Sequence, residues 1–480
     1  MRRNIVISFV QKHIQLLVSI GSVMILSRLI SPEETGVFSI GVAIAALTHA
    51  IRDFGVGNYL IKEAEITRQK TQTAFTVSFL IAAILSLILF GVSFPVAAFY
   101  AKPEVASVIW ITTLGLLVSP FSTIAIALLL RNQRFVDIFK ISMASALANA
   151  GVSILCGWLG YGAKALALGQ LASSVALVIA ANLVLRNGGM YRLSLMHWKD
   201  VSHFGFHMTV SGVSEQLGGR ASDLVVGKLI GFGAVGLLSR SGTLVTMVQD
   251  SVQTAVMPVV LTSMSQDVRK SGNVAPLLLK SLCYFSVVMW PVYAVISLFA
   301  HDAIGVLFGP KWLEAAPYTS VLCYGAALAV LSSLVSTTCN ATNNAHLLSR
   351  YSLTAQGLRV LLVILGAMSG DLGIVVRLLV CAELLQCGLA FFIIRSTTGI
   401  QLSQLVHNCW RSLVVAVLVV AAMMPLRLLD CAPVLRLVVV GFSAALAWLL
   451  AVYLVRHPIA QEASNAFGMI VLRLRALRTR

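Results

Sequence analysis

The chain has 480 residues, of which 58% are hydrophobic and 11% charged, and its formal net charge is +17. Soluble globular proteins carry about 25% charged and about 45–50% apolar residues, so this composition excludes a soluble enzyme. The excess of basic residues is typical of loops that set the orientation of a membrane protein and contact anionic lipid. The sequence contains no separate basic domain, so nucleic-acid binding is not predicted.

Apolar segments can be followed from one end of the chain to the other. The first six lie at about 4–30, 36–57, 73–100, 105–130, 136–158 and 165–185. After a polar connection, eight more lie at about 204–230, 234–262, 275–300, 315–338, 350–369, 371–394, 410–428 and 433–455. Each is long enough to cross a bilayer as a helix, so we predict an all-α integral membrane protein with about 14 transmembrane helices.

These segments divide the chain into five parts. We expect a six-helix bundle over 1–186, a cytoplasmic connection over 187–202, a second six-helix bundle over 203–395, two additional transmembrane helices over 396–456 and a basic cytoplasmic tail over 457–480. The tail is either a surface helix on anionic headgroups or a solvated basic segment.

The distribution of lysine and arginine predicts the orientation. If the N-terminus is cytoplasmic, nineteen of the 35 basic residues fall on the cytoplasmic face and six on the opposite face. Basic residues collect in cytoplasmic loops, and here the asymmetry returns in every other loop. We therefore expect an even number of spans with both termini in the cytoplasm.

An internal repeat relates the two predicted bundles. RLISPEETGVFSI at 28–40 and KLIGFGAVGLLSR at 228–240 align without a gap at an offset of 200, and Gly36 meets Gly236. Each segment joins the first and second helices of its bundle. Because six spans return the chain to the side it entered from, the repeats should be parallel, with a substrate site between them near the midplane.

Polar residues concentrate in the leading helices of the two bundles. In the seventh segment, Gln216, Arg220, Asp223 and Gly227 recur at four and three residues, which places them on one helical face. Such stripes usually face a protein interior or an aqueous cavity, because an ionisable group at the bilayer centre costs at least about 2.5 kcal/mol. The stripes would wall a hydrophilic chamber; alternatively, Arg220 and Asp223 neutralise each other structurally.

Neither a cofactor nor a metal is predicted. The eight cysteines contain no CxxC pair, and most lie in or beside apolar segments, which is typical of buried free thiols. His203 and His207 have the i, i+4 spacing of a metal pair, but no acidic residue completes a metalloprotease motif, and a position at the membrane interface explains them better. No catalytic grouping or long external loop indicates an enzyme.

Several motifs resemble the polysaccharide transporter family, the Wzx-like lipid-linked oligosaccharide flippases of the multidrug/oligosaccharidyl-lipid/polysaccharide exporter superfamily. They are SRLISPEETGVFSIG at 27–41, DFGVG at 53–57, SDLVVGKLIGFGAVGLLSRSGTL at 222–244, VMPVVLTSMS around Pro258 and LFGPKWLEAAPY at 307–318. The resemblance implies two six-helix bundles with two further C-terminal helices in the bacterial inner membrane. It also implies outward movement of undecaprenyl-pyrophosphate-linked repeat units by alternating access, for exopolysaccharide, capsule or O-antigen (lipopolysaccharide) biosynthesis.

The resemblance directs attention to charged residues of the leading helices. Guanidinium groups bind phosphates bidentately, so the candidates for gripping the pyrophosphate in a cationic cavity are Arg28, Arg52, Arg220 and Arg240. The candidates for charge pairing or ion coupling are Asp53, Glu215, Asp223 and Asp250. The expected partners are the lipid-linked oligosaccharide, membrane lipids and, among proteins, a polysaccharide polymerase and a chain-length regulator.

Two other functions compete with the flippase. A small-molecule or cation antiporter of the same superfamily should have a cavity of net acidic character, which the excess of arginine in the leading helices disfavours. A membrane enzyme acting on polyprenyl-linked sugars is disfavoured by the short loops and the missing catalytic groups.

Overall fold

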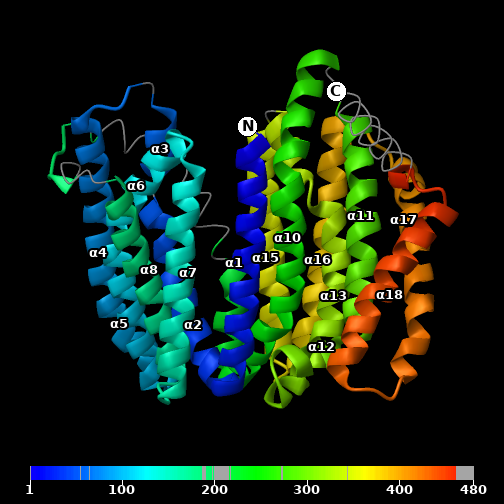
Figure 1. The fold of residues 1–480 in the computed structure, drawn as a ribbon, viewed down its shortest axis with the longest axis horizontal. Helices are drawn as coiled ribbons and strands as arrows, with labels where there is room; N and C mark the ends of the chain where they lie inside the picture. Colours follow the sequence, from blue (N-terminus) through cyan, green and yellow to red (C-terminus); the bar gives the residue numbers. More distant parts are fainter. Residues whose placement is uncertain are drawn as a thin grey trace, which may run out of the picture. The chain divides into compact units, whose positions relative to one another are not determined.

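The structure is a computed structural model, and it describes residues 2–53, 56–63, 65–185, 191–196, 198, 216, 218–271, 274–342 and 344–460. Every regular element in these ranges is a helix (Figure 1). Among the described residues, eight helices are long and apolar enough to cross a membrane, and a bent pair adds a ninth. The predicted all-α class is thus confirmed for the described residues.

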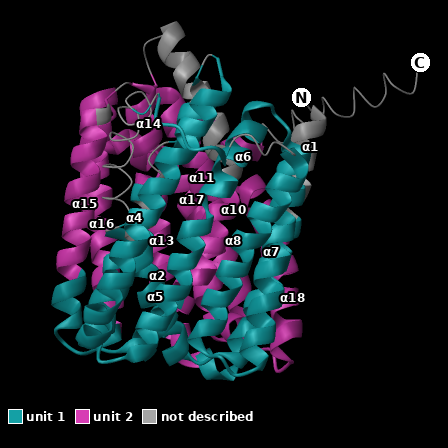
Figure 2. Cartoon of the chain, turned by 90° about the vertical axis from the view of Figure 1, so that its left-hand side faces the viewer, with its two compact units in different colours: residues 1–239, 307–312, 363–372 teal, residues 240–306, 313–362, 373–480 magenta. Residues whose placement is uncertain are grey.

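The helices form two compact units, which Figure 2 colours separately. The first unit comprises residues 1–239, 307–312 and 363–372, and the second comprises residues 240–306, 313–362 and 373–480. The helices of the first part of the chain are α1 (Arg2–Leu29), α2 (Pro32–Asp53), α3 (Val56–Lys62), α4 (Arg68–Tyr100), α5 (Pro103–Val118), α6 (Pro120–Arg131), α7 (Phe135–Trp158) and α8 (Ala163–Leu185). A further helix covers residues 218–229.

The remaining helices follow from α10 onward. They are α10 (Phe232–Ser271), α11 (Ala275–Leu298), α12 (Ala300–Leu307), η2 (Pro310–Ala315), α13 (Ala316–Ser332), α14 (Val335–Ala341), α15 (Ala345–Ala367), α16 (Leu372–Thr398), α17 (Leu402–Met423), η3 (Met424–Leu428) and α18 (Pro433–Leu454).

The predicted span at about 105–130 is bent in the structure. The structure has two helices there, α5 and α6, which are bent by 47° at their junction. Pro120 begins α6, and a proline has no N–H to continue the hydrogen-bond ladder and clashes with the preceding turn. The apolar composition predicted the crossing, whereas the proline sets the bend.

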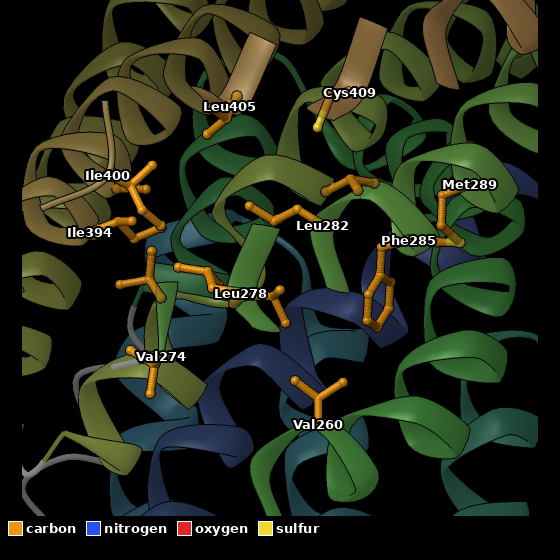
Figure 3. Close-up of a cluster of buried hydrophobic side chains, with 14 of the residues drawn as sticks. Val260, Val274, Leu278, Leu282, Phe285, Met289, Ile394, Ile400, Leu405 and Cys409 are labelled. Carbon is orange, nitrogen blue, oxygen red and sulfur yellow. The ribbon is translucent and has the colours of Figure 1, made fainter. Parts of the chain in front are cut away.

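A buried apolar cluster organises the second unit (Figure 3). Its centre is one face of α11, where Leu278, Leu282, Phe285 and Met289 recur at four, three and four residues. Side chains from neighbouring helices, such as Leu405 of α17, complete the cluster. α11 is therefore the central support of this unit.

Polar contacts also attach the C-terminal helices α17 and α18 to this unit. The Trp448 indole N–H donates to the Val287 carbonyl at 2.7 Å, and Arg436 forms an ion pair with Asp302 at 3.0 Å. Because these contacts lie at different heights along α18, they fix this helix against α11 and α12.

Beyond the end of α18, the fully buried His457 makes a third attachment. Its Nδ1 accepts a hydrogen bond from the Ile459 N–H, so Nε2 carries the proton and faces Ser412 Oγ at 3.2 Å. Cys283 Sγ of α11 lies at the same distance from Nε2. Burial, with a smaller contribution from the Arg411 charge, lowers the pKa of His457 to about 4. The imidazole is therefore neutral in the folded chain at physiological pH.

We expect this histidine to make stability depend on pH. An unfolded histidine has a pKa near 6.5, so below about pH 6.5 the unfolded state binds a proton that folded His457 does not bind until about pH 4. The free energy of unfolding should fall by about 2 kcal/mol between pH 7 and pH 5 through this residue alone. Melting temperatures of the wild type and of His457→Gln, which cannot titrate, measure the effect. Parallel pH profiles for the two proteins would contradict the prediction.

Candidate functional site

The first unit contains a set of contacts between four chain segments that we call the clasp: residues 24–36, 99–102, 224–236 and 307–312. Two of these segments overlap the predicted repeats at 28–40 and 228–240. The first one starts α2 with a capping box, because Ser31 Oγ accepts from the Glu34 N–H at 3.3 Å and Glu34 accepts from the Ser31 N–H at 2.8 Å. Pro32 occupies the first helical position, where a missing N–H costs nothing. This local chemistry fixes where α2 begins.

Two glycines of the clasp bring backbone directly against backbone. A Cβ atom on Gly36 would lie 1.9 Å from the carbonyl oxygen of Phe232, and a Cβ on Gly236 would lie 1.9 Å from the carbonyl oxygen of Pro32. No side chain larger than hydrogen fits at either place. The contact is reciprocal at an offset of 200 residues, which is what two equivalent segments related by a local twofold axis would produce.

Two basic residues of the clasp, which are also related by the offset of 200, make similar contacts. Arg28, in the last turn of α1, donates to the carbonyl of Leu307 at 3.5 Å, and Lys228, at the offset of 200, donates to the carbonyl of Phe99. Each basic residue thus neutralises carbonyls at the C-terminal end of another helix, where the helix dipole is negative. Lys228 also lies 4.2 Å from the centre of the Phe99 ring.

Two aromatic residues complete the clasp. The indole N–H of Trp312 donates to the Ser27 carbonyl at 2.7 Å, and the hydroxyl of Tyr100 donates to the Leu224 carbonyl at 2.9 Å. Trp312 is fully buried. Both acceptors lie near the end of the first helix of a repeat, so this third pair of contacts follows the same pattern as the first two.

The chemistry of the clasp suits reversible closure. Its hydrogen bonds end on backbone carbonyls, and water can replace such donors when the segments separate, so each bond contributes only about 1 kcal/mol. The exposed ion pair between Lys102 and Glu33, at 2.7 Å, lies beside these contacts. The hydrogen bond to Glu33 raises the pKa of Lys102, which keeps this residue charged.

The predicted arginines of the first unit lie far apart. Arg28 is exposed in the clasp, whereas Arg52 lies in the last turn of α2, about 30 Å along that helix from its start at Pro32. Arg28 and Arg52 therefore do not hold one pyrophosphate at the same time. Arg220 lies 3.7 Å from Asp223, which is the pairing that the sequence left open as a structural alternative.

The other predicted site residues divide between the second unit and the undescribed positions. Arg240 is buried, with 8% of its surface exposed, and Asp250 is exposed on α10. The backbone of Asp53 ends α2, but its side chain lies outside the described residues, as does all of Glu215.

Part of the clasp could be found in the sequence and part could not. The aligned repeats identify Gly36 with Gly236 and Arg28 with Lys228. Tyr100 and Trp312 carry no repeat signal, because they lie in segments of different length. Trp312 lies in one of the motifs that resemble the family, but that motif assigned no role to it. Tyr100 had no sequence signal at all.

The described residues contain no group of three histidine, cysteine or acidic side chains that could hold a metal ion. His203 and His207 lie outside the described residues.

Comparisons with known proteins fit this picture. The family described as "Polysaccharide biosynthesis protein" matches residues 25–317, which is more than half of the chain. The succinoglycan biosynthesis transport protein ExoT of Rhizobium meliloti is 24% identical over 63% of this chain, but the match covers only 61% of ExoT. The lipopolysaccharide biosynthesis protein WzxC of Escherichia coli is 21% identical, and the match covers 80% of this chain and 79% of WzxC.

Solved structures show the same fold. The lipid II flippase MurJ in an inward closed conformation matches 94% of this chain and 100% of its own, with a TM-score of 0.77 and 14% identity. An inward-facing multidrug transporter of the MATE family matches 81% of this chain and 96% of its own, with a TM-score of 0.57 and 14% identity. The chain is thus a multi-pass helical membrane protein with this fold.

Alanine at either clasp glycine should open the contact. Gly236→Ala places a Cβ against the Pro32 carbonyl, and Gly233→Ala, whose Cβ would meet nothing within 4 Å, is the matched control in the same helix. We expect a cysteine at the buried position Ser27 to be labelled by a membrane-impermeant maleimide at least about tenfold faster in Gly236→Ala, since each 1.4 kcal/mol lost from the closed state is tenfold in population. The assay uses a background without the eight native cysteines.

Equal labelling rates for Gly236→Ala and Gly233→Ala would show that the glycine contact does not hold the segments closed.

Proposed function

The chain belongs to the polysaccharide biosynthesis protein family, and we propose that it is a flippase that moves undecaprenyl-pyrophosphate-linked oligosaccharide repeat units from the cytoplasmic to the periplasmic leaflet of the bacterial inner membrane. A pyrophosphate and its sugars cannot cross about 30 Å of hydrocarbon unaided, because their polar groups would lose hydration without compensation. A polyprenyl tail can stay in lipid throughout. The protein then has to shelter only the polar headgroup.

The clasp is the observation that carries this proposal. A transporter that works by alternating access must close one end of its path and later open it. The clasp gives the chain a closure made of backbone contacts and carbonyl-directed donors, which can separate without rebuilding a side-chain core. Lys102, Lys228 and Lys311 of the clasp are three of the six basic residues that we expect on the face poor in lysine and arginine. Under the positive-inside rule, this supports a periplasmic position for the clasp.

The reciprocal contacts also support the proposed architecture. We infer about 14 spans in two six-helix bundles related by a parallel repeat, followed by α17 and α18, with both termini cytoplasmic. Clasp contacts that recur at an offset of 200, such as those of Gly36 and Gly236, are expected of parallel repeats meeting at a twofold axis.

The arginines act in sequence in this proposal. Arg52, at the far end of α2, and the partly exposed Arg220 meet the headgroup first, and Arg28 becomes available when the clasp opens. Asp223 pairs with Arg220 in the unloaded protein, and Arg240, Asp53, Glu215 and Asp250 complete the candidate charges. An inside-negative potential favours outward movement of each negative charge by about 2.3 kcal/mol per 100 mV.

Released repeat units would pass to a polysaccharide polymerase and a chain-length regulator. We propose these proteins as partners because a flipped repeat unit is useful only once it is joined to others. In this proposal the polymerase joins the repeat units, and this chain acts as a transporter that forms no bonds.

Replacing Arg220 or Arg52 with alanine should reduce surface polysaccharide about tenfold, because a charge-assisted hydrogen bond contributes about 1.5–3 kcal/mol. Lipid-linked precursor of unchanged chain length should accumulate inside the cell. Arg427→Ala, at an exposed position between α17 and α18, is the matched control and should export normally.

The double variant Arg220→Ala/Asp223→Ala separates binding from structural pairing. If the pair only neutralises charge, removing both residues restores export, whereas a binding role leaves export low. If Arg52→Ala and Arg220→Ala both export like the wild type at normal protein levels, neither arginine belongs to the site.

A further inference from the structure

A second polar site lies inside the second unit, between α15 and α16. Arg359 of α15 and Glu383 of α16 form an ion pair at 3.6 Å, and both side chains are partly buried, with 29% and 21% of their surface exposed. Glu383 is eleven residues from the start of α16, about 17 Å along the helix, which is the middle of a span. Ionisable groups at this depth are expensive and usually functional.

On the two helices that carry this pair, three buried polar atoms have no hydrogen-bond partner in the described part of the chain. They are Gln356 Oε1, Gln386 Nε2 and Arg359 Nε. Gln386 has only 8% of its surface exposed. Each glutamine lies three residues from a member of the ion pair, on the same face of its helix. Since α15 and α16 run antiparallel (Figure 1), the two glutamines form a layer one turn away from the ion pair.

Leaving such atoms unpaired is costly, so native proteins nearly always satisfy them. These three atoms are one acceptor and two donors, and each exposes less than 1 Å² of surface. A sugar or a lipid headgroup cannot reach them, but a water molecule with two to four polar partners can occupy such a place. The chemistry therefore indicates bound water beside a carboxylate.

Few other groups affect the charge of Glu383. Arg359 is the opposite charge, and Tyr351 of α15 and Cys387 of α16 are the other titratable groups that interact with the carboxylate. From α13, the backbone approaches at Gly325, whose Cβ would lie 3.6 Å from Glu383 Cγ. Among the described residues, the titratable groups that interact with this carboxylate are thus one cation, one phenol and one thiol.

We propose that Glu383 is a proton-exchange site of the transport cycle, supplied by water held between Gln356, Gln386 and Arg359. On protonation, a hydronium ion transfers its proton to the carboxylate, which leaves water and a neutral carboxylic acid. The acid can then donate to the bound water beside Gln356, and Arg359 keeps its charge without its partner. The carboxyl group therefore has two arrangements that differ by one proton. The role of Glu383 in the transport cycle rests on the proposed transport function, whereas the exchange of a proton at Glu383 does not.

Infrared difference spectroscopy on the purified full-length protein tests the chemistry without any substrate. A pH step should give a carboxylic-acid C=O band that is absent in Glu383→Gln and retained in Asp430→Asn, the control at an exposed carboxylate between α17 and α18. If Glu383→Gln keeps the whole band change of the wild type, the proposal is overturned. Unchanged melting temperatures show that the variants are folded.

Transport in proteoliposomes tests the coupling. With a lipid-linked oligosaccharide as substrate, one coupled proton should change the steady-state leaflet ratio about tenfold per unit of imposed pH gradient. Glu383→Gln should lose this response and keep downhill exchange, while Asp430→Asn should respond like the wild type. An equal gradient response in Glu383→Gln would overturn the assignment.

The two experiments separate the two proposals. If the wild type moves no lipid-linked oligosaccharide, the proposed function fails, and the infrared band still decides whether Glu383 exchanges a proton. If the wild type transports but shows no gradient response, the coupling role is wrong and the flippase proposal stands.

Discussion

Backbone meeting backbone at Gly36 and Gly236 is the constraint on which the rest of this account depends. Because a Cβ at either position would overlap a carbonyl oxygen, the helix starts can touch only while both residues are glycine. The contact in turn places Arg28 and Lys228 on helix-end carbonyls and allows Trp312 to be buried against Ser27. A closure of this kind is specific in shape but modest in energy, which is what a repeatedly opened contact requires.

The second unit combines firm attachment with one exchangeable group. Trp448, Arg436 and His457 fix the C-terminal helices to the apolar support formed by α11, and all three contacts are hydrogen-bonded or ion-paired. Within that unit, the layer around Glu383 contains three buried polar atoms that have no hydrogen-bond partner among the described residues.

Much of the fold followed from composition and spacing, and the site followed only in part. Long apolar segments predicted the helices, and the repeat at an offset of 200 residues paired Gly36 with Gly236. Both signals can be found by comparing stretches of the sequence without knowing the structure. The bend at Pro120 was missed, because hydropathy measures the apolar character of a segment and does not register the missing N–H of a proline. Gln356, Arg359, Glu383 and Gln386 were also missed, because they form two separate pairs in the sequence and only the antiparallel packing of α15 on α16 brings the pairs together.

The most direct test measures whether the clasp opens when cargo is present. Spin labels at Glu33 and Gly233, equivalent positions at the starts of α2 and α10, report the separation of these two helix starts by pulsed electron resonance in liposomes. This account predicts one short distance in the empty protein and a second, longer population on addition of a lipid-linked oligosaccharide. A single short distance under all conditions, in protein that transports, would contradict it.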